Sequence, residues 1–311
     1  MTTPVIEVEG LRKSYARLRG GPTRALDGLD LTVPAGGVFG FLGPNGAGKT
    51  TTIRCLLGLV RPTGGRGRLF GVDTQSGLPS VIGRTGSMVE TPQFFPNFSG
   101  RRNLELLAPL AGVGRRRVRD VLDLVGLGSR AGSPFRTYSL GMKQRLGLAA
   151  ALLKDPELLI LDEPANGLDP AGIKEVRDLL RRLGAEGRTV FVSSHLLGEV
   201  QHMCDRVAIL ARGRLVTEGS VADVLASGRT ARLVVRVDPA PAALDALHAA
   251  GLDASLDGDR ILVDAPAEEG ARVTRILADA RIYLSELRPE EIDLETVFLE
   301  LTQAQPERVG E

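Results

Sequence analysis

The stretch Gly43-Pro44-Asn45-Gly46-Ala47-Gly48-Lys49-Thr50 decides the fold of this chain. It has the pattern of a P-loop, in which glycines let successive backbone N–H groups turn toward a phosphate. Lys49 is expected to reach the β- and γ-phosphates of ATP, and Thr50 is expected to bind Mg²⁺. We therefore predict an ATP site formed by residues 43–51, with Thr51 as its last member.

The flanking sequence predicts the strand and helix that a P-loop requires. Val38–Leu42 is a continuous apolar run, typical of a strand buried on both faces of a parallel sheet. After Lys49, apolar residues recur at helical spacing as far as Val60, and Pro62 ends that pattern. The motif thus has its expected context.

Strands and helices alternate further along the chain, which predicts an α/β domain with a largely parallel core sheet. Buried strands are predicted at 158–161 and 189–193, and helices at 172–183 and 221–226. A hairpin is predicted around 211–213, and short strands at 5–8 and 29–33. From about 84 to 157 the pattern is mostly helical, with helices at 100–110, at 115–127 and from Ser139 onward.

A domain boundary is predicted at Ser227-Gly228-Arg229-Thr230, between a first domain of residues 1–228 and a second of 229–311. The second is expected to run strand, helix, two strands, helix, strand, which suggests a small ferredoxin-like α+β unit. A last helix is predicted at 294–301.

Two carboxylates end the strand Leu158-Leu159-Ile160-Leu161. Asp162 suits a Mg²⁺ ligand, directly or through water, and Glu163 suits a base that polarises the attacking water. An apolar run before Asp-Glu is a weak signal alone, and a strong one downstream of a P-loop.

Composition excludes several function classes. The 39 Lys and Arg against 38 Asp and Glu leave a net charge of +1, so the overall charge gives no sign of nucleic-acid binding. The N-terminus lacks the features of a signal peptide, and no apolar run is long enough to span a membrane. Any membrane role is therefore expected to act through a partner. Cys55 and Cys204 are expected to be free thiols.

The segment Tyr138-Ser139-Leu140-Gly141-Met142-Lys143-Gln144-Arg145 resembles the signature of ABC-transporter ATPases. Ser139 and Gly141 match the common form, whereas Leu140 and Met142 depart from it in a way that resembles the drug- and antibiotic-exporter branch, of the daunorubicin- and bacitracin-resistance type. The resemblance covers about residues 5–226. Independently of it, Ser139 suits the N-cap of a helix whose first amides can face an anion.

The resemblance implies an ABC ATPase core with an antiparallel N-terminal β part, a helical subdomain and a small C-terminal domain. It also implies that two copies, or this chain and a related ATPase subunit, share each ATP, which would lie between one P-loop and the signature loop of the opposite subunit. That loop comprises Ser139, Leu140, Gly141 and Met142.

Other family positions follow residue by residue. Tyr15 matches the aromatic that stacks on adenine, although a core tyrosine is the alternative and an insertion at about 16–23 follows it. His195 matches the switch histidine near the γ-phosphate, and Asn166 and Asp169 match the loop that crosses the dimer interface. Asn166 replaces the usual serine.

The Mg²⁺-binding glutamine of the family is replaced. By alignment with Gly86–Pro92, its position is occupied by Glu90, which we favour as the ligand over Gln93. A carboxylate still offers an oxygen ligand, and its charge is expected to strengthen Mg²⁺ binding while worsening repulsion with phosphate if the ion is absent.

An aromatic cluster follows this loop. Phe94, Phe95 and Phe98 are three of only nine phenylalanines, and the resemblance implies docking of a short helix from a membrane permease here. Local core packing is the alternative. The basic run Arg115–Arg119 could touch lipid headgroups or nucleic acid, and a solvated helix face is favoured.

The resemblance implies an ATP-hydrolysing subunit that drives efflux of a drug, antibiotic or other hydrophobic small molecule through a separate permease, at the cytoplasmic face of the membrane. An ABC ATPase acting on ribosomes or DNA is disfavoured, because the chain has one P-loop and no long coiled-coil insertion. An importer subunit is disfavoured by the form of the signature and by Glu90 in the place of the usual glutamine. A module that binds ATP without hydrolysing it is disfavoured because Lys49, Asp162, Glu163 and His195 are all intact.

Overall fold

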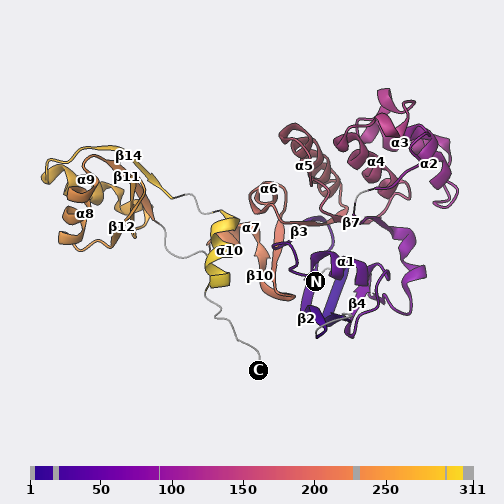
Figure 1. Ribbon diagram of the computed structural model, residues 1–311, viewed down its shortest axis with the longest axis horizontal. Helices are drawn as coiled ribbons and strands as arrows, with labels where there is room; N and C mark the ends of the chain where they lie inside the picture. The colour runs from indigo at the N-terminus through magenta and orange to yellow at the C-terminus, as the bar shows by residue number, and fades with distance from the viewer. Residues whose placement is uncertain (1–3, 17–20, 91, 227–231, 291–292, 304–311) are drawn as a thin grey trace. The chain divides into compact units, whose positions relative to one another are not determined.

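The computed structural model describes residues 4–16, 21–90, 92–226, 232–290 and 293–303 (Figure 1). The chain divides into two compact units, Met1–Val224 and Leu225–Glu311. The boundary that the sequence places between residues 228 and 229 lies outside the described residues.

A six-stranded sheet forms the centre of the first unit, in the order β10-β9-β3-β8-β7-β6. Five strands run parallel and β10 is antiparallel to β9, which confirms the predicted α/β class with a parallel core sheet. β3, β7 and β8 are almost wholly buried because both faces of the sheet are covered. The strands are β3 (Gly37–Leu42), β6 (Thr85–Met88), β7 (Leu158–Asp162), β8 (Thr189–Ser194), β9 (Arg206–Ala211) and β10 (Arg214–Ser220).

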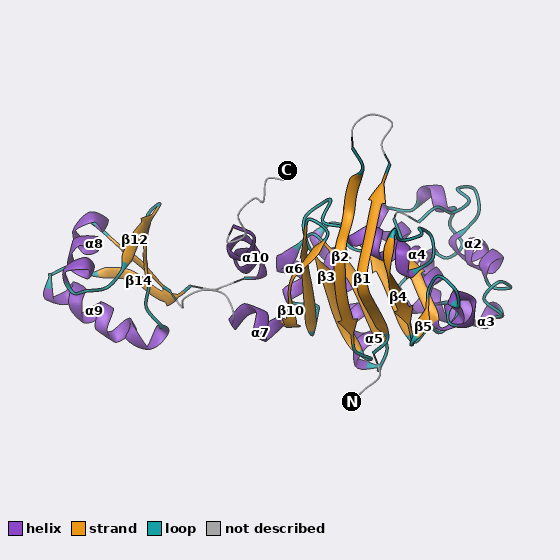
Figure 2. Ribbon diagram, turned by 90° about the horizontal axis from the view of Figure 1, so that it is seen from below, coloured by secondary structure: helices purple, strands orange, loops and turns teal. Residues whose placement is uncertain are grey.

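A four-stranded antiparallel sheet, in the order β2-β1-β4-β5, lies beside the N-terminus (Figure 2). Its strands are β1 (Ile6–Tyr15), β2 (Thr23–Val33), β4 (Gly64–Leu69) and β5 (Val72–Asp73). Together these strands form the antiparallel N-terminal β part that the resemblance implied.

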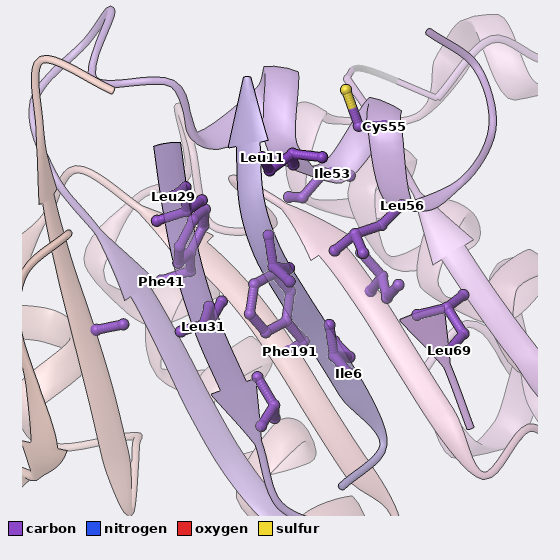
Figure 3. Packing of buried hydrophobic residues seen from close by; sticks show 14 of the residues in the cluster. Ile6, Leu11, Leu29, Leu31, Phe41, Ile53, Cys55, Leu56, Leu69 and Phe191 are labelled. Atoms are coloured by element: carbon purple, nitrogen blue, oxygen red, sulfur yellow. The ribbon is translucent and has the colours of Figure 1, made fainter. Parts of the chain in front are cut away.

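The main core of the first unit joins both sheets to the helix α1 (Lys49–Leu56). Figure 3 shows Ile53 and Leu56 of α1 among side chains from both sheets, including Phe41 and Phe191 of the parallel sheet and Leu29 of the antiparallel one. α1 ends at Leu56, earlier than the apolar spacing to Val60 suggested, because Gly58 takes a positive φ of 68°. This packing anchors the helix that begins at the P-loop.

The helical region starts later than expected. Residues 85–88 form β6, which pairs with β7 at the edge of the core sheet, so the predicted start near residue 84 is wrong. A four-residue strand is too short to stand out from its surroundings in sequence. The helices beyond it are α2 (Gly100–Leu107), α3 (Arg115–Leu124) and α4 (Leu140–Leu152), followed after β7 by α5 (Pro170–Ala185), α6 (Leu197–Gln201) and α7 (Val221–Ala226). Short 3-10 turns lie at Leu78–Ser80, Ile82–Arg84, Gly128–Arg130 and Phe135–Thr137.

The four arginines of the basic run on α3 do not all face solvent. Arg115, Arg116 and Arg119 are exposed, as a solvated helix face requires. Arg117 instead turns inward and donates to the carbonyl oxygens of Leu152 and Leu153 at 2.7 and 3.2 Å, at the end of α4. One of the four arginines is thus structural.

The second unit contains a four-stranded antiparallel sheet in the order β12-β13-β11-β14. Its elements run β11 (Leu233–Val237), α8 (Ala240–Ala249), β12 (Ala254–Asp257), β13 (Arg260–Val263), α9 (Gly270–Asp279) and β14 (Leu284–Pro289), with a 3-10 turn at Ala267–Glu269 and a last helix α10 (Leu294–Gln303). This order is the split βαβ arrangement. Val235, Ile261 and Val273 belong to a separate hydrophobic core, which supports the description of this part as a small α+β unit.

Candidate ATP site

The P-loop connects β3 to α1 in a shape that only glycine permits. Gly43 has a φ of 152°, and a Cβ there would collide with the carbonyl oxygen of Leu210. Gly48 has a φ of 110°, and its Cβ would lie 2.7 Å from the carbonyl oxygen of Ala25. Gly48 is also the N-cap of α1 and offers no side chain to the first amides of the helix. These amides and the helix dipole together suit a phosphate.

Lys49 is held inside the loop that it follows. Only 5% of the residue is exposed, and its Nζ donates to the carbonyl oxygens of Gly43 and Pro44 at 2.6 and 3.3 Å. The same nitrogen lies 3.2 Å from Oε1 of Glu163. The ammonium is thus positioned against the backbone of the P-loop and the end of β7.

Neighbouring parallel strands bring three of the other predicted polar residues, His195, Glu163 and Glu90, to the edge of the sheet where the P-loop begins. β3, β8, β7 and β6 are consecutive in the sheet, and their carboxyl ends precede the P-loop, His195, Glu163 and Glu90, respectively. Ligands of open α/β sheets bind at this edge. Strand order, which the sequence does not state, therefore gathers residues from four separate segments.

Glu163 links Lys49 to His195. Its Oε2 lies 2.8 Å from Nδ1 of His195 and accepts from the His195 backbone N–H at 3.3 Å. Glu163 has a φ of 49°, in the left-handed region that non-glycine residues rarely occupy. Such backbone strain is found where a site must hold a side chain in one direction.

Asp162 and Thr50 offer the oxygen ligands that Mg²⁺ prefers. Asp162 is 5% exposed, and Thr50 is half-buried in the first turn of α1. Among the described residues no three His, Cys, Asp or Glu side chains are grouped to hold a metal ion. A Mg²⁺ ion in an ATPase commonly takes only one or two side-chain ligands together with phosphate oxygens, so the residues fit an ion that binds with ATP.

Glu90 pairs with a residue of α1, the helix that contains Thr50. Its carboxylate forms an ion pair with Arg54, and Arg54 follows Thr50 by four residues on the same face of α1. Glu90 also has a positive φ, of 63°, and its side chain is 63% exposed. Gln93 is exposed in the loop beyond it. Its position beside α1 makes Glu90 the better placed of the two for a ligand role, which stays a prediction.

The signature segment and the loop of residues 166–169 lie together. Ser139 is the N-cap of α4, as predicted, and its Oγ accepts from the N–H of Met142 at 3.3 Å. Asp169 is the N-cap of α5 and accepts from the N–H of Gly172 at 3.2 Å. Both helix starts line one surface groove, together with Leu140, Gly141, Gly167, Leu168 and other residues of α4 and α5. Met142 and Asn166 do not line it, and none of residues 43–51 does.

Tyr15 ends β1 in the hairpin with β2, where it pairs with Thr23. It is 36% exposed, and Nζ of Lys13 lies 5.0 Å from the centre of its ring. A partly exposed aromatic ring at a strand end is accessible to a base, so its role against adenine stays a prediction. The inserted residues 17–20 lie outside the described part of the chain.

The three clustered phenylalanines divide into two kinds. Phe94 packs edge-on against Phe135 with ring centres 5.3 Å apart, which fits the alternative of local packing. Phe95 and Phe98 contact each other and are 61% and 42% exposed, which fits a docking surface.

Several residues of the site were not identified from the sequence. Ser193 donates to the carboxylate of Asp162 and accepts from the backbone N–H of Glu163, and Arg54 pairs with Glu90. Asn103, which is 2% exposed, exchanges hydrogen bonds with the backbone of Phe95 and also donates to that of Phe98. The only sequence signal for Asn103 and Ser193 was a polar residue in an apolar-periodic segment, which is too common to be specific.

The fold and the P-loop geometry define a P-loop nucleoside triphosphatase of the α/β class. The ABC transporter family model matches residues 26–166. The chain is 45% identical over 222 residues to the bacitracin transport ATP-binding protein BcrA of Enterococcus faecalis, covering 71% of this chain and 70% of that protein. It is 37% identical over 311 residues to the daunorubicin/doxorubicin resistance ATP-binding protein DrrA of Streptomyces peucetius, covering 96% and 93%.

A solved structure, of CbiO1 from Clostridium perfringens, part of the ABC transporter complex CbiONQ, is also similar. It has a TM-score of 0.64 and 29% identity, and the match covers 72% of this chain and 92% of CbiO1. The chain belongs to the ABC transporter ATP-binding protein family, and it is an ATP-binding, ATP-hydrolysing subunit. No helix in the described ranges is both long enough and apolar enough to cross a membrane.

Proposed function

We propose that this ATPase powers the export of a drug, antibiotic or other hydrophobic small molecule through a separate membrane permease. The similarity to DrrA, which extends over 96% of the chain, supports this proposal because it includes the second unit as well as the ATPase core. The similarity to BcrA supports the same branch. The subunit would act at the cytoplasmic face of the membrane, held there by the permease.

Two copies, or one copy and a related ATPase subunit, would share each ATP. The observation that carries this step is the groove at Ser139, Gly141 and Asp169, which none of the chain's own P-loop residues lines. Exposed helix N-termini attract anions, so this groove suits the γ-phosphate held by a second copy. Leu140 and Met142 of the signature loop and Asn166 of the neighbouring loop would contribute to the same interface.

Hydrolysis would use the residues at the end of β7 and β8. Glu163 would accept a proton from water as the water oxygen attacks the γ-phosphorus and the bond to ADP breaks. Lys49 would bind the transferred phosphoryl group, and His195 would contact it while holding Glu163 through the 2.8 Å contact. Mg²⁺, when bound with ATP, would neutralise phosphate charge, and Thr50, Asp162 and Glu90 are the residues proposed to hold it.

The remaining assignments concern binding and organisation. Tyr15 would stack on adenine, and Phe95 and Phe98 would form the exposed part of the permease-docking surface. Residues 1–228 would form the ATPase domain, and its helical part would start after β6. Residues 229–311 would form an accessory domain. The division of the chain into two compact units supports this organisation.

Mixing two inactive variants tests the shared site. Lys49→Ala and Ser139→Ala subunits should each hydrolyse ATP poorly. A mixed dimer contains one intact site, because the P-loop of the Ser139→Ala chain faces the signature loop of the Lys49→Ala chain. Activity should therefore rise on mixing and depend on the ratio of the two proteins. Constant low activity at every ratio, with mixed dimers shown by differently tagged subunits, would contradict a shared site.

A second test concerns dimerisation itself. A Glu163→Gln protein should retain ATP and form a dimer in saturating Mg-ATP, measured by light scattering, while the same protein carrying Lys49→Ala should stay monomeric. A Glu163→Gln protein that remains monomeric with and without its membrane partner would count heavily against the proposal. Co-purification should identify that partner as a polytopic membrane protein.

A further inference from the structure

Ser193 lies opposite Asp162 in the parallel pair of β7 and β8, at the edge of the sheet that faces the P-loop. The residue is fully buried. Its Oγ is 2.5 Å from Oδ1 of Asp162, and the backbone N–H of Glu163 donates to the same Oγ at 3.1 Å. One hydroxyl thus contacts the carboxylate of Asp162 and the backbone of Glu163 in the ATP site.

The direction of these hydrogen bonds follows from the available protons. The Glu163 amide can only donate, so Oγ of Ser193 accepts from it. An ionised Asp162 can only accept, so the single hydroxyl proton of Ser193 is directed to Oδ1. The rotation of the hydroxyl is therefore determined by its two partners, and one oxygen of Asp162 is fixed in return.

The same residue supports the strained backbone of Glu163. The N–H of Glu163 also donates to the carbonyl oxygen of Ser193 at 3.2 Å, so side chain and backbone of Ser193 share this one donor. A φ of 49° at Glu163 persists only where the surroundings hold it. From this backbone the Glu163 carboxylate reaches both Lys49 and His195.

We propose that Ser193 is a positioning residue for ATP hydrolysis, which orients the Asp162 carboxylate toward Mg²⁺ and holds Glu163 in the conformation that directs its carboxylate to the reacting water. This inference rests on the proposed roles of Asp162 and Glu163. Hydrogen-bond partners behind a metal ligand commonly change metal affinity or activity by about 10- to 100-fold when they are removed.

Ser193→Ala tests the inference through nucleotide binding as well as turnover. Calorimetric titration with a non-hydrolysable ATP analogue should show unchanged affinity without Mg²⁺, because Lys49 keeps its hydrogen bonds to the carbonyl oxygens of Gly43 and Pro44. The gain in affinity on adding Mg²⁺ should fall about 10-fold or more, and kcat should fall by about 10- to 100-fold. Ser193→Thr should restore both, because it keeps the hydroxyl, and residue 193 is one of those that line a small pocket with Val176 and Val200.

Thr189→Val is the matched control. Thr189 lies at the other end of β8, is also buried, and accepts from the N–H of Gly36 at 2.8 Å, so its loss removes a comparable hydrogen bond away from the ATP site. It should lower thermal stability without changing the Mg²⁺ dependence. If Ser193→Ala does not fold, Ser193→Cys, which keeps the size of the side chain but is a weak donor, should show the same loss of Mg²⁺ dependence.

The outcomes separate this inference from the proposed function. If Asp162→Asn loses the effect of Mg²⁺ on binding and Ser193→Ala keeps it within twofold, the role of Ser193 is wrong and that of Asp162 stands. If Asp162→Asn also keeps it, the assignment of Asp162 is wrong. Equal losses of activity and stability in Ser193→Ala and Thr189→Val would reduce Ser193 to a structural role and overturn the inference.

Discussion

The carboxylate of Glu163 lies 3.2 Å from the ammonium of Lys49, so the proposed base and the proposed phosphate-binding cation form an ion pair across the end of the core sheet. Lys49 is 5% exposed, and the side chain of Glu163 is 20% exposed. A buried pair of this kind is stable only while each charge keeps a partner. A phosphate can replace Glu163 as the partner of Lys49, which would free the carboxylate to act on water.

Lys49→Ala should therefore abolish most of the ATPase activity. Loss of a cation that stabilises developing charge commonly lowers kcat by about 100- to 1,000-fold, and ATP affinity should fall as well. Steady-state phosphate release and nucleotide titration measure the two effects. Lys154→Ala is a control, because this exposed lysine contacts only the carbonyl oxygen of Ile82 in the hydrogen bonds described. Activity within threefold of wild type for Lys49→Ala would contradict the assignment.

Glu90→Ala should raise the Mg²⁺ concentration needed for half-maximal ATPase activity, whereas Gln93→Ala should have little effect. Glu90 lies beside Arg54 on the face of α1 that includes Thr50, and Gln93 is exposed farther along the loop. Glu90→Gln, which keeps an oxygen ligand without the charge, should fall between wild type and the alanine variant. Loss of activity only with Gln93→Ala would reverse this choice of ligand.

Replacing both Phe95 and Phe98 with alanine should weaken binding to the permease without unfolding the ATPase. Both side chains are exposed, and Asn103 holds the backbone between them. An aromatic side chain that acts as a hot spot of an interface costs about 2 kcal/mol or more of binding free energy when it is truncated. Co-purification with the permease and basal ATPase activity measure the two properties. Leu110→Ala, at an apolar side chain that is 84% exposed outside this loop, should leave permease binding intact.

Truncation after residue 228 should leave a folded ATPase core. The core of the first unit and that of the second consist of different residues, so neither hydrophobic cluster loses members on cleavage. We expect ATP binding to persist and ATP-dependent dimerisation to weaken, as light scattering of the truncated and full-length Glu163→Gln proteins would show. Unchanged dimerisation, ATPase activity and transport would remove the case for a supporting role of the second unit.

Asp155→Asn should cost stability at neutral pH but not in acid. Burial favours the neutral acid, but contacts with Arg188 at 3.0 Å and Arg117 at 2.9 Å outweigh it and hold the pKa of Asp155 below its ordinary value. At pH values above the ordinary pKa, the ionised Asp155 therefore stabilises the fold. This stabilisation is lost as the pH falls through the lowered pKa. Because the side chain is 63% exposed, the effect should be less than about 1 kcal/mol.

Thermal unfolding of wild type and Asp155→Asn at pH 7 and near pH 3 measures this effect. The difference in Tm between the two proteins should be largest at pH 7 and should shrink in acid. Glu268→Gln is a control for the general effect of removing one exposed carboxylate. A difference in Tm that stays constant across this range would show that the charge of Asp155 is not what stabilises the fold.

Burial also suppresses the reactivity of the two cysteine thiols. Cys55 and Cys204 are both free and buried, as a chain with two cysteines and no disulfide framework suggested. Burial raises the pKa of each thiol above its ordinary value, so the reactive thiolate is suppressed at neutral pH.

Local sequence by itself determined the P-loop, the buried strand that ends at Asp162, and the N-cap at Ser139. These depend on interactions within a few residues: glycines that permit positive φ, apolar runs that require burial, and a side chain that bonds to the next turn of its own helix. The same local rules predicted the α/β class and the order of elements in the second unit.

Tertiary structure alone decided which distant residues meet. The strand order β3-β8-β7-β6 places Ser193 against Asp162, and Glu163 between Lys49 and His195. The packing of helices and loops likewise decides the pairing of Glu90 with Arg54 and the contact of Arg117 with the end of α4. Strand pairing joins residues far apart in the chain, and neither β6 nor Ser193 had a local pattern to reveal its neighbours, so this part of the site required the fold.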